Sequence, residues 1–196
     1  GTKPELFADR TLIMLRFLPL ILLIAACSGT SLRYPVPVPE VTESVSIRFG
    51  SVEVRDVSLP SYAAGEEIQI QRADGALVSS GDVLWADDPS REVSLALSRN
   101  LAALTGAKVA NEPWPFDGFA DARVEVRVEE MLAVESGAFR LTGQYFVAPT
   151  NGRGDRSDYF SIAAPYDPAG GIAAISAARA AALLELSERI AQDGLR

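Results

Sequence analysis

Apolar and polar residues alternate along several short stretches of the chain, which is the pattern of half-buried β-strands. The clearest stretch covers residues 123–129, where three valines alternate with charged residues. Turn residues separate neighbouring stretches, and Asp74-Gly75 and Ser136-Gly137 are dipeptides typical of tight hairpins. The pattern predicts strands over residues 45–49, 52–57, 68–72, 76–78, 83–85, 124–128, 139–147 and 159–162.

Two longer stretches follow the 3.6-residue period of an amphipathic helix. The first begins after Asp87-Asp88-Pro89, where acidic caps precede a proline, and ends at Gly106. The second is rich in alanine and covers roughly residues 172–192. The apolar faces comprise Val93, Leu97, Leu101 and Leu104 in the first helix, and Ile175, Ala182, Leu183, Leu186 and Ile190 in the second.

Each amphipathic helix needs a sheet face that covers its apolar stripe. Because the short strands are separated by hairpin turns, the sequence predicts an α+β fold. We expect a single domain over residues 44–196, with a mainly antiparallel sheet and two amphipathic helices packed on it. The sequence contains no internal repeat and no second domain boundary.

One long apolar run precedes this domain and ends at Cys27, the only cysteine of the chain. The run covers residues 17–26 after Arg16, which is the layout of a bacterial export signal. Its end, Ala26-Cys27, also resembles the lipobox of bacterial lipoproteins, whose peptidase cuts between these two residues before the cysteine carries acyl chains. We therefore expect residues 1–26 to be an upstream extension and signal peptide, with the signal proper at about 14–26.

Other interpretations of this region stay open. The apolar run almost reaches the roughly 20 residues that span a bilayer, so an uncleaved anchor is one alternative. A lone cysteine is also commonly a small apolar core residue. Between Cys27 and the domain, residues 27–43 contain alternate prolines over 35–39, which favour a stiff extended linker or, equally, an edge strand laid on the domain.

Composition excludes several classes of function. The chain has 18 Lys and Arg against 26 Asp and Glu, a net charge of −8, and no basic stripe, so we expect no nucleic-acid partner. Anionic headgroups would repel such a body, so membrane attachment is expected from acyl chains on Cys27. The chain has no histidine, which excludes a serine–histidine pair and histidine metal ligands, and one cysteine cannot form a disulfide within the chain.

The sequence predicts no catalytic residue, cofactor or metal site. Glu125, Glu129 and Glu130 are grouped carboxylates, but strand alternation explains Glu125 and Glu129 as a solvated face beside arginines. Trp114, Phe116 and Phe119 lie in a loop that its prolines and glycine keep out of regular structure. These aromatic residues are candidates for contact with a partner or lipid, and filling of the core is the alternative.

In this order, the elements resemble the ABC-type transport auxiliary lipoproteins of the paraquat-inducible C (PqiC) type. The resemblance spans nearly the whole chain after the signal, and the order of the elements carries it. The proline-rich stretch departs from the plain early strand that the resemblance leads us to expect. The residues that carry the resemblance are the lipobox ending at Cys27, Leu59-Pro60-Ser61-Tyr62, residues 68–72, Val83-Leu84-Trp85-Ala86-Asp87 with Leu97 and Leu101, Pro113-Trp114, and the helix from Ala173 to Ala191.

The resemblance implies a non-catalytic periplasmic subunit, anchored by lipid in the outer membrane, that docks or caps the shuttle of an intermembrane phospholipid transport system. It implies two partners, a mammalian-cell-entry (MCE) domain protein and the inner-membrane permease of the same system, and a homo-oligomeric ring as a candidate assembly. Ser28 favours the outer membrane, because an aspartate after the cysteine often signals retention in the inner membrane. Two alternatives stay open: a lipid or lipoprotein carrier with its own apolar cavity, and an enzyme that uses carboxylates alone.

Overall fold

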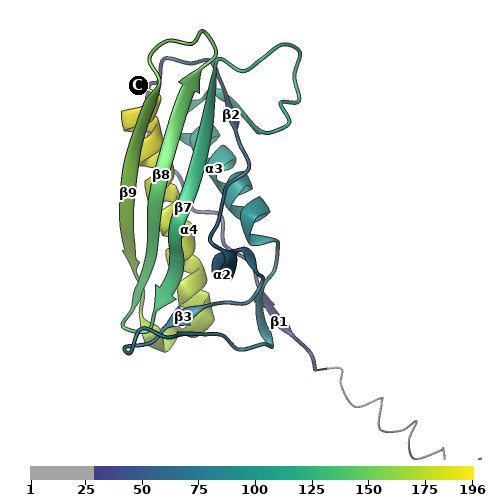
Figure 1. The fold of residues 1–196 in the computed structure, drawn as a ribbon, viewed down its shortest axis with the longest axis vertical. Helices are drawn as coiled ribbons and strands as arrows, with labels where there is room; N and C mark the ends of the chain where they lie inside the picture. The colour runs from purple at the N-terminus through teal and green to yellow at the C-terminus, as the bar shows by residue number, and fades with distance from the viewer. Residues whose placement is uncertain (1–28) are drawn as a thin grey trace, which may run out of the picture. The chain divides into compact units, whose positions relative to one another are not determined.

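The computed structural model describes residues 29–196, in which Leu32–Arg196 form one compact unit (Figure 1). The predicted signal peptide, with Ala26 and Cys27, lies outside the described residues. The strands and α-helices in chain order are β1 (Leu32–Tyr34), β2 (Ser51–Val54), α2 (Ser61–Ala64), β3 (Ile70–Gln71), β4 (Leu77–Val78), β5 (Val83–Trp85), α3 (Pro89–Thr105), β6 (Lys108–Asn111), β7 (Ala122–Val134), β8 (Ala138–Pro149), β9 (Arg156–Pro165) and α4 (Gly171–Arg189). A 3-10 turn, Pro168–Gly170, precedes α4, and a π-helical turn, Ile190–Gly194, follows it.

The strands form a mixed seven-stranded sheet and a separate pair of β1 with β5. The three long strands β7, β8 and β9 lie side by side and antiparallel. On the other side of β7, β2 pairs near its start and β3 pairs near its end, and β6 and β4 extend from them. Within residues 29–196, four of the seven strand pairings are parallel: β1–β5, β2–β6, β2–β7 and β3–β7.

The prediction of an α+β fold with a mainly antiparallel sheet and two helices is wrong. The fold is α/β with a mixed sheet, and the described part of the chain has three α-helices, of which α2 is a single turn. The reason lies in the connections, because a helix between two strands returns the chain in the same direction. Helix α2 lies between β2 and β3, and α3 precedes β6. Residues 45–49, predicted as a strand, form none.

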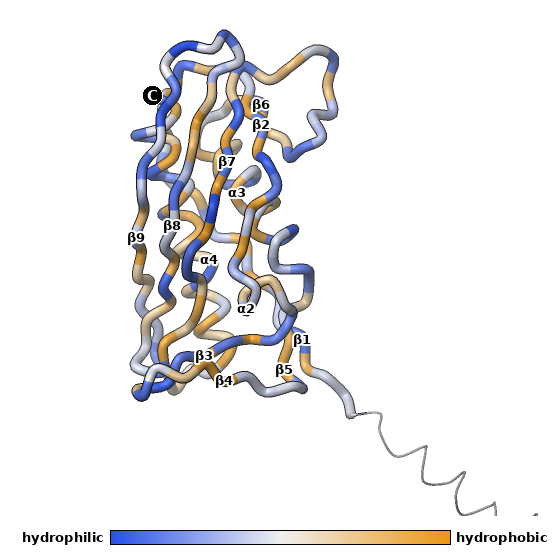
Figure 2. Tube along the Cα trace, in the orientation of Figure 1, coloured by the Kyte–Doolittle hydropathy of each residue, from blue (hydrophilic) through white to orange (hydrophobic). Residues whose placement is uncertain are grey.

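The hairpin predicted at Ser136-Gly137 is confirmed. Strands β7 and β8 pair antiparallel from Val134 and Ala138 outward, and Gly137 adopts the positive φ of 101° that suits a tight turn. Along β7, buried residues alternate with exposed ones at the start of the strand, as the sequence predicts, and Figure 2 shows the corresponding change between hydrophobic and hydrophilic positions. One face of the sheet is therefore apolar and the other is solvated.

Helix α3 begins and ends close to the predicted residues. The side chain of Asp88 accepts a hydrogen bond of 2.8 Å from the backbone N–H of Arg91, and Pro89 occupies the first turn. Gly106, with φ of 68°, ends the helix in the left-handed conformation. Capping chemistry acts between neighbours in sequence, and so local residues alone define these bounds.

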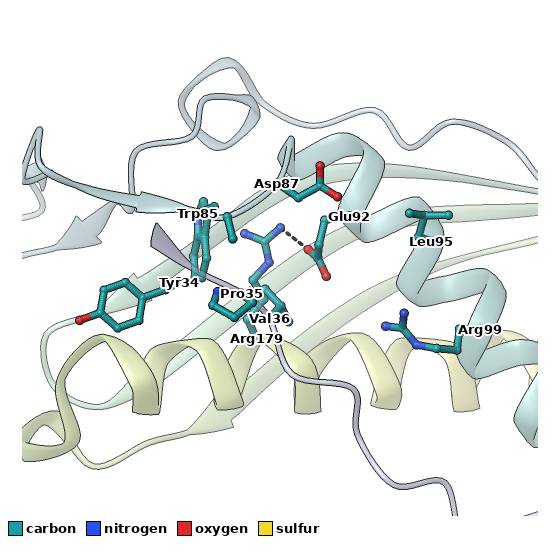
Figure 3. A pocket seen from close by; sticks show the side chains of 10 residues that line it. Tyr34, Pro35, Val36, Trp85, Asp87, Glu92, Leu95, Arg99 and Arg179 are labelled. Atoms are coloured by element: carbon teal, nitrogen blue, oxygen red, sulfur yellow. Dashed lines mark hydrogen bonds and ion pairs between the residues drawn. The ribbon is translucent and has the colours of Figure 1, made fainter. Parts of the chain in front are cut away.

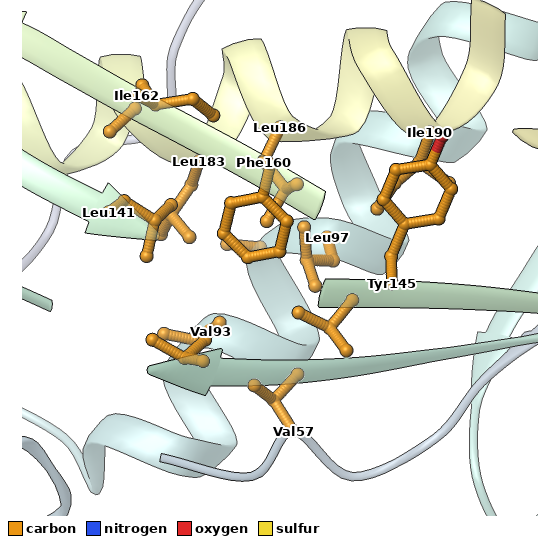
Figure 4. Close-up of a cluster of buried hydrophobic side chains, with 14 of the residues drawn as sticks. Val57, Val93, Leu97, Leu141, Tyr145, Phe160, Ile162, Leu183, Leu186 and Ile190 are labelled. Atoms are coloured by element: carbon orange, nitrogen blue, oxygen red, sulfur yellow. The ribbon is translucent and has the colours of Figure 1, made fainter. Parts of the chain in front are cut away.

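The core lies between the apolar face of the sheet and helices α3 and α4 (Figure 4). Leu97 of α3 and Leu183 of α4 belong to the same buried cluster as Leu141 and Phe160 of the sheet. By length and composition alone, Pro168–Gly194 could cross a membrane. Because its apolar side chains are buried in this cluster, we interpret the helix as part of the core.

Candidate functional site

The chain enters the compact unit as an edge strand, β1. This strand pairs in parallel with β5, which places Tyr34 beside Trp85. The next residue, Pro35, is bound to α4, because its carbonyl oxygen accepts a hydrogen bond of 2.6 Å from the Ser176 hydroxyl. Strand β1 ends before the first proline, and residues 35–39 themselves form no strand.

Beneath this edge strand lies a buried arginine, Arg179, from the middle of α4 (Figure 3). Its guanidinium carbon lies 4.4 Å from the centre of the Trp85 ring, and its Nη2 atom lies 2.5 Å from a carboxylate oxygen of Glu92 on α3. Burial lowers the pKa of Arg179 from its ordinary value, and the Glu92 carboxylate opposes that shift. The positive charge of Arg179 on α4 therefore interacts with both Glu92 on α3 and Trp85 on β5, and this cluster joins the three elements.

The arginine cluster borders a hollow of about 200 Å³ next to the N-terminal segment. Residues that line it include Tyr34, Val36, Trp85, Leu95, Arg99 and Arg179 (Figure 3). Sequence analysis missed the cluster, although a signal was present: Arg179 stands four residues after Ile175 and four before Leu183, so helical spacing places it on the apolar face. A charge at such a position requires a buried partner. We infer that this cluster holds the N-terminal segment, which is β1 and the proline-rich residues after it, against the rest of the domain.

The carboxyl group of Glu188 on α4 predicts how stability depends on pH. Burial raises the pKa of Glu188 on α4, and the nearby carboxylates of Glu43 and Glu185 raise it further. A raised pKa in the folded state means that stability present below the ordinary pKa of 4.5 is lost as the pH rises through the folded pKa. We expect Glu188→Gln to unfold at a higher temperature than the parent chain at pH 7, and the difference to vanish below about pH 4.

Thermal unfolding of both chains at several pH values measures this effect. Glu129→Gln is the matched control, because Glu129 is exposed on the sheet. An equal gain for Glu188→Gln at neutral and acidic pH would contradict the electrostatic explanation.

The predicted aromatic loop connects β6 with β7 and lies at the opposite end of the domain from β1 (Figure 1). Trp114 and Phe116 meet edge to face, with ring centres 5.0 Å apart, and the Lys108 ammonium lies 4.6 Å from the centre of the Phe116 ring. Phe119 is 87% exposed, whereas Trp85 is buried in the core. The loop thus presents apolar side chains to solvent, and its contact with a partner or lipid stays a prediction.

Two of the three grouped glutamates, Glu125 and Glu130, are engaged in ion pairs. An oxygen of Glu125 lies 2.7 Å from Nη2 of Arg127, and an oxygen of Glu130 lies 2.6 Å from Nε of Arg140. These partners are partly exposed, as a solvated strand face requires. In the part of the chain that the structure describes, no group of three or more acidic, cysteine or histidine residues is placed to hold a metal ion.

The sequence pattern of one family, the ABC-type transport auxiliary lipoprotein components, matches residues 32–191. The chain belongs to this family. The match begins at the first residue of β1, and the prolines follow this strand. No curated protein matches the chain.

Solved structures share the fold of this auxiliary lipoprotein. An uncharacterized protein has 22% sequence identity and a TM-score of 0.64, over 83% of this chain and 97% of its own. A protein of the DUF330 family from Xanthomonas campestris has 17% identity and a TM-score of 0.67, over 84% and 95% of the two chains. A PelC dodecamer from Paraburkholderia phytofirmans is more distant, with 10% identity and a TM-score of 0.46 over 80% and 98%. At such identities the likeness to the first two structures shows the fold alone.

Family membership defines the general role of the auxiliary lipoprotein. Its family consists of auxiliary components of ABC-type transport, so the chain is associated with a transport system. Because the family is one of lipoproteins, the protein is anchored to a membrane of the cell envelope. The finer assignments, which are the type of system, the membrane and the partners, are proposals.

Proposed function

We propose that this auxiliary lipoprotein is a non-catalytic outer-membrane subunit of an MCE/ABC-type system that transports phospholipid between membranes. In this proposal, acyl chains on Cys27 hold the domain at the periplasmic face of the outer membrane, and the aromatic loop docks or caps the periplasmic shuttle. Ser28 supports the outer membrane, because it lacks the acidic side chain that often signals retention in the inner membrane.

The observation that carries the proposal is that β1, which follows the predicted anchor, and the aromatic loop lie at opposite ends of the domain (Figure 1). Cys27 precedes Leu32 by five residues, and an extended chain spans at most about 3.6 Å per residue, so the anchor would hold β1 within about 18 Å of the bilayer. Strand β8 runs 12 residues along the domain, which is about 40 Å at about 3.3 Å per residue. The aromatic loop lies at the far end from β1 (Figure 1), where it is available to components beyond the anchoring membrane.

The chemistry of the loop favours a protein partner over the bilayer. Exposed aromatic side chains such as Phe116 and Phe119 are enriched at protein interfaces, where a partner covers their apolar area. The net charge of −8 disfavours approach to anionic headgroups. We propose the MCE-domain protein as the direct partner and the permease as the next component of the same system. A homo-oligomeric ring of such domains would present several loops to one shuttle.

The core disfavours the alternative of a carrier with its own lipid cavity. The space between the sheet and the helices, where such a cavity would lie, holds Leu97, Leu141, Phe160, Leu183 and their buried neighbours (Figure 4). A drug-sized ligand needs an enclosed pocket of roughly 300–1,000 Å³. The hollow beside the buried arginine is about 200 Å³, and the larger hollows, of about 380–430 Å³, are lined mainly by surface residues outside this core.

Photo-crosslinking in the native envelope tests the docking proposal. With a photoreactive amino acid at position 116 or 119 of the full chain, we expect a crosslink to the MCE-domain protein. Position 159 is the matched control, because Tyr159 is also exposed, at 68%, but lies on β9. The intact mass of the same protein tests the anchor, and we expect cleavage between Ala26 and Cys27 with acyl chains on Cys27.

Different results would contradict the docking role of the loop and the lipid anchor on Cys27. Crosslinks from position 159 without any from positions 116 and 119 would remove the docking role of the loop. An unmodified Cys27 thiol with the leader still attached would remove the lipid anchor. Stoichiometric phospholipid in the purified protein, enclosed in its core, would instead establish the carrier.

A further inference from the structure

A hollow of about 390 Å³ lies beside the aromatic loop, at the end of the domain away from β1. Three segments form its walls: the residues before β2, the end of the loop before β7, and the turn between β8 and β9. The arginine cluster beneath β1 lies apart from it, and the docking loop shares only Phe119 and its neighbour Ala120 with it. Its lining includes Arg48, Phe49, Phe119, Asp121, Pro149 and Arg153.

The hollow has an excess of positive charge. Among residues 29–196, neither Arg48 nor Arg153 has a carboxylate within ion-pair distance. The acidic residue of the lining, Asp121, is already engaged, because its Oδ2 atom accepts hydrogen bonds of 3.0 and 2.9 Å from the backbone N–H groups of Gly50 and Ser51. The Arg48 guanidinium carbon lies 5.1 Å from the centre of the Phe49 ring, which supports its position. Two guanidinium groups are therefore available to an anion.

The same hollow has an exposed apolar wall. Phe119 presents 87% of its surface to solvent, and Phe49 and Pro149 also line the site. Phe119, Ala120 and Thr150 are shared with a second hollow of about 380 Å³, so the two hollows adjoin along the Phe119 side chain. A ligand that bound the arginines would therefore have apolar surface next to its anionic group.

We propose that this hollow binds an anionic amphiphile, in which a phosphate accepts hydrogen bonds from Arg48 and Arg153 and an attached apolar chain covers Phe119. Guanidinium groups suit phosphate because their planar N–H donors match two of its oxygens. The apolar chain would remove Phe119 from water, which favours the amphiphile over free phosphate. The site shares Phe119 with the docking loop, but it also requires two arginines that docking through the loop does not.

Calorimetric titration of the full chain with three probes tests the site. The probes are octyl phosphate below its micellar concentration, inorganic phosphate, and octyl glucoside as a neutral amphiphile. We expect octyl phosphate to bind most tightly, because it alone offers both the anion and the apolar chain. We expect Arg48→Gln and Arg153→Gln each to weaken it about tenfold, which is the typical effect of one hydrogen bond to a charged group.

Further variants test the contribution of the apolar wall and the specificity of binding to this hollow. Phe119→Ser is expected to weaken octyl phosphate severalfold and to leave inorganic phosphate unchanged, since it removes only apolar contact. Arg72→Gln and Tyr159→Ser are the matched controls, because both side chains are exposed away from the hollow and neither should change binding. The thermal unfolding temperature of each variant shows whether it is folded.

Three results would overturn the proposal. Absence of octyl phosphate binding, or unchanged binding in both arginine variants, would remove the anion site. Equal affinity for inorganic phosphate and octyl phosphate, unaffected by Phe119→Ser, would make it a site for free phosphate. Octyl glucoside that bound as tightly as octyl phosphate would make the hollow merely apolar. Because no partner protein is present, failure of the crosslinking experiment would leave this result unaffected.

Discussion

Glu92→Ala is expected to lower the free energy of unfolding by about 3–5 kcal/mol, which is the typical effect of removing one partner of a buried ion pair. Arg179 is 1% exposed, and its side chain lies between Trp85 and Glu92. Without the Glu92 carboxylate, the buried guanidinium keeps its charge but loses its counter-ion. The Glu92 side chain is 15% exposed, so partial access of water places the expected value toward the lower end.

Denaturant-induced unfolding followed by tryptophan fluorescence measures this change. Glu185→Ala is the matched control, because Glu185 also pairs with an arginine of α4 but both side chains are at least 40% exposed, and its expected effect is below about 1 kcal/mol. The double replacement Glu92→Leu with Arg179→Met should regain most of the loss, since apolar residues can fill the place of a buried pair. Equal losses for Glu92→Ala and Glu185→Ala would show that the cluster is no more than a surface ion pair.

Gly143→Ala is the second large effect, and we expect a loss of about 3 kcal/mol or more in the free energy of unfolding. Gly143 lies on β8 opposite Val128, where the register of β7 and β8 shifts. A Cβ atom here would overlap the backbone oxygen of Arg127 and lie 2.9 Å from the Phe160 ring. Because backbone on one side and a buried ring on the other confine the site, the two strands would have to separate.

Chemical denaturation of the alanine variant checks this expectation. Gly65→Ala is the control, because a Cβ atom at Gly65 meets no atom within 4 Å, and its expected effect is close to zero. Similar stability of Gly143→Ala and the parent chain would show that β7 and β8 adjust at this position without loss of packing.

Sequence reasoning succeeded where the determining contacts are local. Asp88, Pro89 and Gly106 bound α3 as predicted, and Asp74-Gly75 and Ser136-Gly137 turn the chain into antiparallel pairs. Capping and turn geometry depend on residues a few positions apart, so they can be recognised in the sequence. The exposure of the aromatic loop also followed from its local composition.

Sequence reasoning failed where the partner is distant in the chain. Alternation shows that residues 52–54 have one buried face, but it carries no information about their neighbours, which are β6 and β7 in parallel. The buried pair of Arg179 and Glu92 joins residues 87 positions apart, and the hollow between Arg48 and Arg153 forms only when three separate segments meet.

By itself, the sequence determined where the chain forms its long helices and tight turns, which apolar side chains of the helices face the core, and which family the chain resembles. Only the tertiary structure decided the direction of strand pairing, the burial of Arg179 and the separation of β1 from the aromatic loop. The physical reason is that the first group depends on neighbours within a few residues, whereas the second depends on how elements far apart in the chain pack on one core.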